Sequence, residues 1–156
     1  VSPWVVPLAA LEGARCQPPP RHEMLAPYLL ETEPWGLDLH LELECNGTVV
    51  SRPSFAGMYW TAAQQLAHMT VNGARLRTGD LYASGTVSGP AAGEWGSFLE
   101  LSWNGRRPLR LRDGSERTFL EDGDVVAIRG TAAGTAGAPI GLGEVKGQIL
   151  PAPRRA

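Results

Sequence analysis

Glu100 is the acidic residue whose neighbours suggest chemistry most directly. It lies within residues 97–103, where large apolar side chains precede and follow it. A carboxylate shielded in this way needs a partner that holds its charge. A Glu100 that faces solvent on the polar side of a strand fits the same pattern. The residues by themselves leave both interpretations open.

A second candidate is the loop at residues 84–90, with the sequence Ser-Gly-Thr-Val-Ser-Gly-Pro. Glycines let backbone N–H groups approach an anion closely, and Thr86 adds a hydroxyl donor. The loop is therefore a candidate for binding a substrate carboxylate. The same composition is also typical of an ordinary β-turn, so the motif alone does not decide.

Glu42 and Glu44 form a third candidate, together with Asp38 and His40. On a strand these alternate side chains point to one face, where two carboxylates can hold a hard cation such as Mg²⁺. The alternative is the solvated polar face of an ordinary strand, and we favour it. We therefore predict no metal ligand in this chain.

The three histidines and two cysteines show no shared spacing with one another or with a carboxylate pair. His22 and His40 lie in unrelated segments, and His68 falls on a helical pattern, where we interpret it as a packing residue. The sequence leaves two states open for Cys16 and Cys45, one disulfide or two free thiols. We interpret them as reduced thiols of a cytoplasmic protein.

The elements that must position these residues are mostly strands. Apolar and polar residues alternate over residues 37–45, and Asn46-Gly47 then provides a hairpin turn before residues 48–50. Further strands are predicted at residues 1–6, 81–84, 99–103, 108–111 and 125–128, with turns at 113–114 and 122–123. In this scheme Glu100 shares a strand face with Phe98 and Ser102. The pattern predicts a mainly β fold, a mixed β-roll or sandwich.

One segment has the spacing of an amphipathic helix. Apolar residues recur at helical intervals over residues 55–71, with Ser54 as the N-cap and Asn72-Gly73 as the end. We expect this single principal helix to pack on the sheets. Residues 11–36 are expected to form an excursion from the sheet, and the Gly/Ala-rich residues 130–143 to form a loop.

The overall composition excludes several classes of protein. The 156 residues suit one domain, and a formal net charge of −2 argues against binding to nucleic acid or to an anionic membrane. No stretch approaches the roughly 20 apolar residues that a membrane-spanning helix needs. The chain begins at Val1, within an apparent strand, so we expect that it is an incomplete chain.

Several runs of residues resemble, in order, the C-terminal part of the catalytic domain in the fumarylacetoacetase (fumarylacetoacetate hydrolase) family. They are Ser-Pro-Trp-Val-Val-Pro at 2–7, Met-Tyr-Trp-Thr at 58–61, Thr-Val-Asn-Gly at 70–73, Gly-Asp-Leu-Tyr-Ala-Ser-Gly-Thr-Val-Ser-Gly-Pro at 79–90, Gly-Ser-Phe-Leu-Glu-Leu-Ser-Trp at 96–103 and Asp-Gly-Asp-Val at 122–125. The resemblance covers nearly the whole chain, residues 1–156, as one part of that domain.

The resemblance implies a mixed β-roll, a homodimer and a divalent metal, Mg²⁺ or Ca²⁺. It implies hydrolysis of 4-fumarylacetoacetate to fumarate and acetoacetate, in tyrosine and phenylalanine degradation. In this family a histidine activates water and a glutamate orients that histidine; the glutamate matches Glu100. The substrate-binding threonine matches Thr86.

This chain also departs from the family pattern. The catalytic histidine, the acidic metal ligands and the oxyanion-stabilising residues belong to family segments that precede it, so the resemblance counts against Glu42 and Glu44 as ligands. We expect the chain alone to be inactive. Two alternatives remain open: a non-catalytic β-domain derived from this fold, or an acylpyruvate-type hydrolase of the same superfamily.

Overall fold

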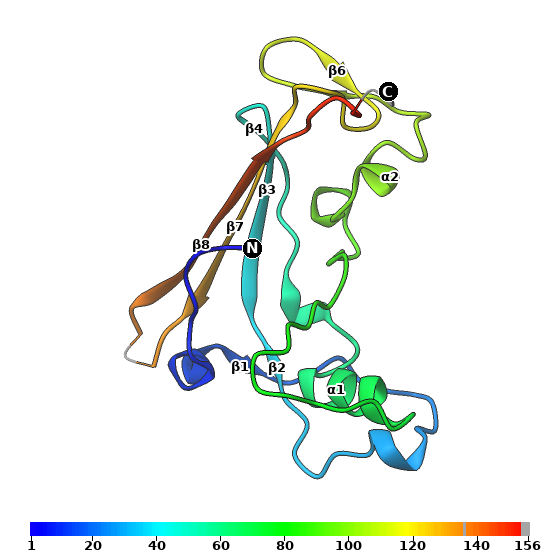
Figure 1. Ribbon diagram of the computed structural model, residues 1–156, viewed down its shortest axis with the longest axis vertical. Helices are drawn as coiled ribbons and strands as arrows, with labels where there is room; N and C mark the ends of the chain where they lie inside the picture. Colours follow the sequence, from blue (N-terminus) through cyan, green and yellow to red (C-terminus); the bar gives the residue numbers. More distant parts are fainter. Residues whose placement is uncertain (136, 154–156) are drawn as a thin grey trace.

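The main element is a four-stranded antiparallel sheet in the order β4-β3-β7-β8. In the computed structural model, which describes residues 1–135 and 137–153, these strands are β3 (Leu39–Cys45), β4 (Thr48–Ser51), β7 (Val125–Ala133) and β8 (Pro139–Gln148). Figure 1 shows the sheet along one side of the molecule and the two α-helices along the other. The prediction of a mainly β fold is confirmed.

The hairpin of β3 and β4 forms where the sequence predicts it. Asn46 and Gly47 both have positive φ, 47° and 75°, as the tight turn between two antiparallel strands requires. Cys45 then pairs with Thr48 across the hairpin. On its other edge β3 pairs with β7 from Leu39 opposite Ala132 to Cys45 opposite Val126.

The Gly/Ala-rich segment at residues 130–143 is strand over much of its length, so the prediction of a loop there is wrong. β7 continues to Ala133 and β8 begins at Pro139, while residue 136 lies outside the described residues. Gly130 shows why small residues occur in these strands: a Cβ there would approach Leu142 Cδ1 to 2.9 Å and Leu41 Cδ2 to 3.3 Å. Small residues here make room for cross-strand leucines.

The principal helix, α1 (Ala62–Thr70), is confirmed but begins later than predicted. Ser54 caps only a short 3₁₀ turn, η3 (Phe55–Gly57). The capping box that starts α1 consists of Thr61, whose hydroxyl accepts from Gln64 N, and Gln64, whose side chain accepts from Thr61 N. Two successive caps therefore divide residues 55–71 into two helical pieces.

Two predicted strands near the candidate residues are absent from the described part of the chain. Residues 81–84 have no regular structure, and Glu100 lies in a short helix, α2 (Phe98–Leu101), instead of a strand. The Ser97 side chain caps this helix by accepting from Glu100 N. Trp103, Asn104 and Gly105 then adopt positive φ values of 51°, 54° and 80°, which end the helix at once.

The remaining elements are short. They are β1 (Arg15–Cys16) paired with β2 (Gly36–Leu37), β5 (Leu109–Arg110) paired with β6 (Glu116–Arg117), and the 3₁₀ turns η1 (Leu8–Ala14), η2 (Pro27–Leu29) and η4 (Ala92–Glu94). The first residues form no strand, although they were predicted to; instead Ser2 and Trp4 lie against Gly143 of β8.

The core lies between η1 and the sheet. Leu11, Ala14 and Ala132 are buried, and partly buried apolar residues pack around them: Val6, Leu37, Leu39, Ile140 and Leu142. Both cysteines are free thiols, and burial raises the pKa of each. Among the described residues, no helix has the length and apolar character that crossing a bilayer requires.

Candidate active site

The Glu100 carboxylate is held by two serine hydroxyls. Ser88 Oγ donates to Glu100 Oε2 at 2.8 Å, and Ser97 Oγ donates to the same oxygen at 2.7 Å. Ser97 is the N-cap of α2, whereas Ser88 belongs to the loop at residues 84–90. The carboxylate is half-buried, so it neither projects freely into solvent nor lies in the core.

The loop that contains Thr86 lies directly against the segment before α2. A Cβ placed on Gly96 would meet the Val87 carbonyl oxygen and would lie 3.0 Å from Thr86 Cγ2. In addition, Gly96 N donates to Ser88 Oγ at 3.0 Å. The structure therefore brings the two sequence candidates, Glu100 and the Thr86 loop, into neighbouring positions, with Thr86 exposed.

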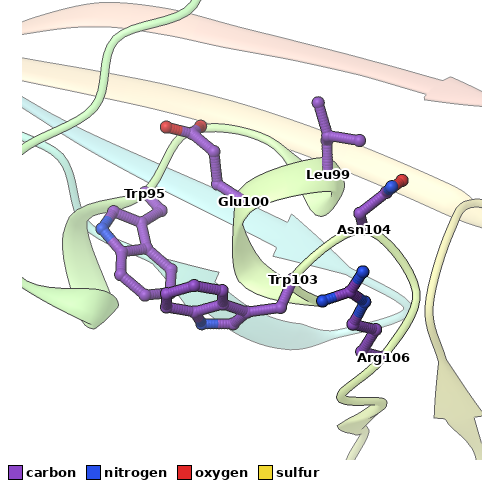
Figure 2. Close-up of a pocket in the computed structure, with 6 residues that line it drawn as sticks. All are labelled: Trp95, Leu99, Glu100, Trp103, Asn104 and Arg106. Carbon is purple, nitrogen blue, oxygen red and sulfur yellow. The ribbon is translucent and has the colours of Figure 1, made fainter.

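A pocket with a volume of about 410 Å³ lies beside Glu100 and is lined by Trp95, Leu99, Glu100, Trp103, Asn104 and Arg106. Trp95 and Trp103 meet edge to face, with ring centroids 5.8 Å apart. Figure 2 shows the Glu100 carboxylate turned away from these two indole rings. The pocket is thus mainly apolar, with its neighbouring carboxylate directed toward the serines.

The carboxylates on β3 are engaged with arginines. Arg129 on β7 lies 2.8 Å from Glu44, 3.5 Å from Glu42 and 2.6 Å from Glu144, and Arg52 lies 3.0 Å from Glu42. The hydrogen bond from Arg129 lowers the pKa of Glu44. The sequence favoured a solvated polar face, whereas Glu42 and Glu44 are partly buried against arginines. These partners were not predicted, because Arg129 is 85 residues away in sequence from Glu44.

These carboxylates do not fit a divalent cation, because arginines already satisfy their charge. Within residues 1–135 and 137–153, no group of three or more His, Cys, Asp or Glu side chains is arranged to hold a metal ion. The remaining members of this cluster, Asp38 and His40, form an exposed pair at 3.6 Å.

The histidines lie elsewhere. His22, His40 and His68 are all exposed, and in the described part of the chain none hydrogen-bonds to Glu100. His68 was interpreted as a packing residue, and it does pack against a neighbour, at the surface of the molecule. It stacks on Tyr28, and the tyrosine hydroxyl lies 3.1 Å from His68 Nδ1.

Sequence reasoning missed the two serines that hold Glu100. For Ser97 a signal was present, since Ser-x-x-Glu at 97–100 is the spacing of a helix N-cap followed by an acidic third residue. For Ser88 there was none, because its contact spans 12 residues and an irregular loop.

A second polar cluster was also missed. Arg21 donates to Gln64 Oε1 at 2.6 Å and to the Tyr59 carbonyl at 3.2 Å, and Thr61 donates to Glu31 at 2.8 Å. This cluster ties the segments on both sides of η2 to the start of α1. We assign it to the architecture rather than to chemistry.

The fold and the site define a mainly β domain that holds a carboxylate beside a glycine- and serine-rich loop. The family model described as "Fumarylacetoacetate (FAA) hydrolase C-terminal" matches residues 1–149. The chain therefore belongs to the fumarylacetoacetate hydrolase family, in the C-terminal region of that family's fold.

Individual relatives agree with this assignment. The chain is 45% identical to the fumarylacetoacetase of Arabidopsis thaliana over an alignment of 159 positions, which covers 98% of this chain and 37% of that protein. It is 45% identical to the Homo sapiens fumarylacetoacetase over 97% of this chain and 38% of that protein. The Caenorhabditis elegans fumarylacetoacetase is also 45% identical, over 97% of this chain and 37% of that protein. The chain thus spans less than two fifths of the length of the curated relatives it matches.

Proposed function

We propose that this chain is the C-terminal portion of a hydrolase that cleaves the C–C bond of 4-fumarylacetoacetate to give fumarate and acetoacetate. One observation carries the proposal: 45% identity along nearly the whole chain to proteins named fumarylacetoacetase. The arrangement around Glu100 supports it, because a carboxylate held by two hydroxyls suits the task of orienting another catalytic group.

In the proposed mechanism Glu100 accepts a hydrogen bond from the imidazole of a histidine supplied by the preceding part of the full-length protein. Such a carboxylate selects the tautomer whose second nitrogen takes a proton from water, and it stabilises the imidazolium that forms. The activated water then attacks the substrate carbonyl, and the tetrahedral adduct collapses by breaking the C–C bond. Fumarate and the acetoacetate enolate are released, and the enolate takes up the proton from the imidazolium. Glu100 remains ionised and transfers no proton itself.

Thr86 is proposed to bind the substrate. Its side chain belongs to an exposed loop next to the segment that positions Glu100, where a hydroxyl can donate to a substrate oxygen. A hydroxyl donor placed there fixes the reacting carbonyl relative to the histidine, and such positioning is a large part of catalytic rate enhancement.

The proposed full-length enzyme uses a divalent metal, Mg²⁺ or Ca²⁺, which stabilises negative charge when bound. Glu42 and Glu44 do not fit that ion, since they are paired with arginines. We therefore derive no step through the metal from these residues. We propose that its ligands lie in the preceding part of the protein.

The proposal extends to the setting of the enzyme. It is a cytoplasmic homodimer that acts on a small molecule in tyrosine and phenylalanine degradation and binds neither nucleic acid nor membranes. The absence of a strong charge excess is consistent with this choice of partner.

An assay of the full-length gene product tests the function. Fumarylacetoacetate and an acylpyruvate are offered separately, with Mg²⁺ and with a chelator. We expect metal-dependent release of fumarate and acetoacetate, with a higher kcat/KM for fumarylacetoacetate than for the acylpyruvate. A preference for the acylpyruvate contradicts the assigned substrate, and no turnover of either compound supports a non-catalytic β-domain instead.

A further inference from the structure

Both hydrogen bonds to Glu100 reach the same oxygen atom. The hydroxyls of Ser88 and Ser97 donate to Oε2 at 2.8 and 2.7 Å, and among the described residues no donor reaches Oε1. A hydroxyl carries a single proton, so each serine uses its whole donor capacity on this carboxylate. Oε2 is therefore occupied twice, while Oε1 is left to accept from another group.

The two serines are themselves fixed by backbone groups. Ser97 Oγ accepts from Glu100 N at 3.3 Å, and Ser88 Oγ accepts from Gly96 N at 3.0 Å. Each hydroxyl thus has an acceptor contact that sets its position and a donor contact to Glu100. Because one serine belongs to the loop at 84–90 and the other caps α2, the carboxylate is held from two separate segments.

We propose that Ser88 and Ser97 are positioning residues that fix the Glu100 carboxylate so that Oε1 alone is presented to the imidazole N–H of the catalytic base. The inference rests on the proposed function and deepens it. A carboxylate with one oxygen held twice cannot rotate to offer the other oxygen, so the imidazole meets a single acceptor in a single direction. Side chains held in this way supply the supporting contacts that a precise catalytic geometry needs.

A merely structural role for these serines predicts a different outcome. If the hydroxyls only held the loop, their removal would lower stability and weaken the binding of substrate by Thr86. This effect would be the same whichever residue stands at position 100. If the hydroxyls act through Glu100, their removal lowers kcat. It has no further effect once Glu100 itself is disabled, because groups acting as a unit are not additive.

The test measures steady-state kinetics of the full-length protein for Ser88→Ala and Ser97→Gly, each alone and combined with Glu100→Gln. Glycine is chosen at Ser97 because it is tolerated at an N-cap while lacking the hydroxyl. Ser88→Thr and Ser97→Thr keep the hydroxyl and serve as rescue variants. Ser115→Ala is the matched control, since it removes a serine hydrogen bond of 2.6 Å to a different carboxylate, Asp113.

We expect each hydroxyl deletion to lower kcat by about 10-fold to 100-fold with KM nearly unchanged, as the loss of one hydrogen bond to a charged group predicts. In the Glu100→Gln background we expect no further loss, and we expect both threonine variants and Ser115→Ala to retain activity. If Ser97→Gly does not fold, Ser88→Ala provides the same test, because Ser88 lies outside the helix.

Two results overturn the proposal while leaving the proposed function intact. One is a wild-type kcat in the deletion variants. The other is a loss of kcat on hydroxyl deletion that has the same size with and without Glu100→Gln. A failure of the proposed function looks different: there the full-length protein does not turn over fumarylacetoacetate at all, or Glu100→Gln turns it over like the wild type.

Discussion

At the scale of single residues, the proposed reaction depends most on the Glu100 carboxylate and on the two hydroxyls bonded to it. We expect Glu100→Gln in the full-length protein to keep its fold and KM but to lower kcat by roughly 10²–10⁴-fold, because an amide cannot stabilise the imidazolium. Steady-state kinetics with circular dichroism check this. Turnover equal to the wild type would remove the assigned role, whatever the family resemblance.

Thr86→Val should act on binding instead. Valine keeps the branched shape but removes the hydroxyl, so a substrate oxygen is left without its donor at a cost of about 1–3 kcal/mol. We expect a higher KM with a smaller change in kcat. Thr131→Val, at an exposed position of β7, is the control. An unchanged KM for Thr86→Val would argue against substrate contact.

The carboxylates of β3 lead to a prediction about the metal. Because Arg129 and Arg52 already hold Glu42 and Glu44, we expect Glu42→Ala and Glu44→Ala to leave the Mg²⁺ affinity of the full-length protein unchanged. Calorimetric titration measures this affinity directly. Loss of tight Mg²⁺ or Ca²⁺ binding in Glu42→Ala would prove the assignment wrong.

At the scale of elements, the closeness of the Thr86 loop to α2 depends on one glycine. A Cβ at Gly96 would collide with the Val87 carbonyl oxygen, a backbone atom that cannot move without displacing the loop. We therefore expect Gly96→Ala to raise KM and lower kcat together, since the same displacement affects Thr86 and Ser88. Kinetics of the full-length variant measure both parameters.

Gly93→Ala is the matched control for that prediction. Gly93 lies three residues earlier in the same connection, and a Cβ there meets nothing within 4 Å. We expect it to behave like the wild type. Equal behaviour of the two alanine variants would show that the loop tolerates displacement and would contradict the close packing described here.

At the scale of the whole molecule, one buried carboxylate joins three separate segments. Asp124, 2% exposed, accepts from Arg117 on β6 at 3.0 Å, from Asn46 in the hairpin turn at 2.8 Å and from Glu121 N at 2.8 Å. Hydrogen bonds from Arg117 and from these other donors lower the pKa of Asp124 to about 2, although burial acts in the opposite direction.

The lowered pKa predicts how stability depends on pH. The folded carboxylate stays ionised down to about pH 2, whereas the unfolded group takes up a proton near its ordinary pKa of 3.8. The stabilisation from Asp124 is therefore complete above pH 3.8 and is lost as the pH falls through about 2. It amounts to roughly 2 kcal/mol.

We expect Asp124→Asn in the full-length protein to have a lower free energy of unfolding at neutral pH and a weaker fall in that energy between about pH 4 and pH 2. Urea unfolding at a series of pH values measures both, with Asp122→Asn, an exposed neighbour, as the control. An unchanged acid dependence in Asp124→Asn would show that this network does not contribute to acid sensitivity.

Local patterns determined much of the sheet. The alternation over residues 37–45 and the Asn46-Gly47 turn predicted β3, β4 and their hairpin correctly, because side-chain period and turn conformation are set by a few adjacent residues. The helix at 62–70 was recognised by its spacing, although its start was displaced by a second cap at Thr61. The candidates Glu100 and Thr86 came from the sequence and its family resemblance alone.

Tertiary structure alone decided the rest. The run around Glu100 is an exception: its apolar pattern fits either period, and local features, the Ser97 cap and the left-handed residues that follow, make it helical. The arginine partners of Glu42 and Glu44 come from β7 and from the residue after β4, and Ser88 reaches Glu100 from a loop without regular structure. Contacts between residues distant in sequence depend on strand register and loop path, and no local pattern of residue types specifies either.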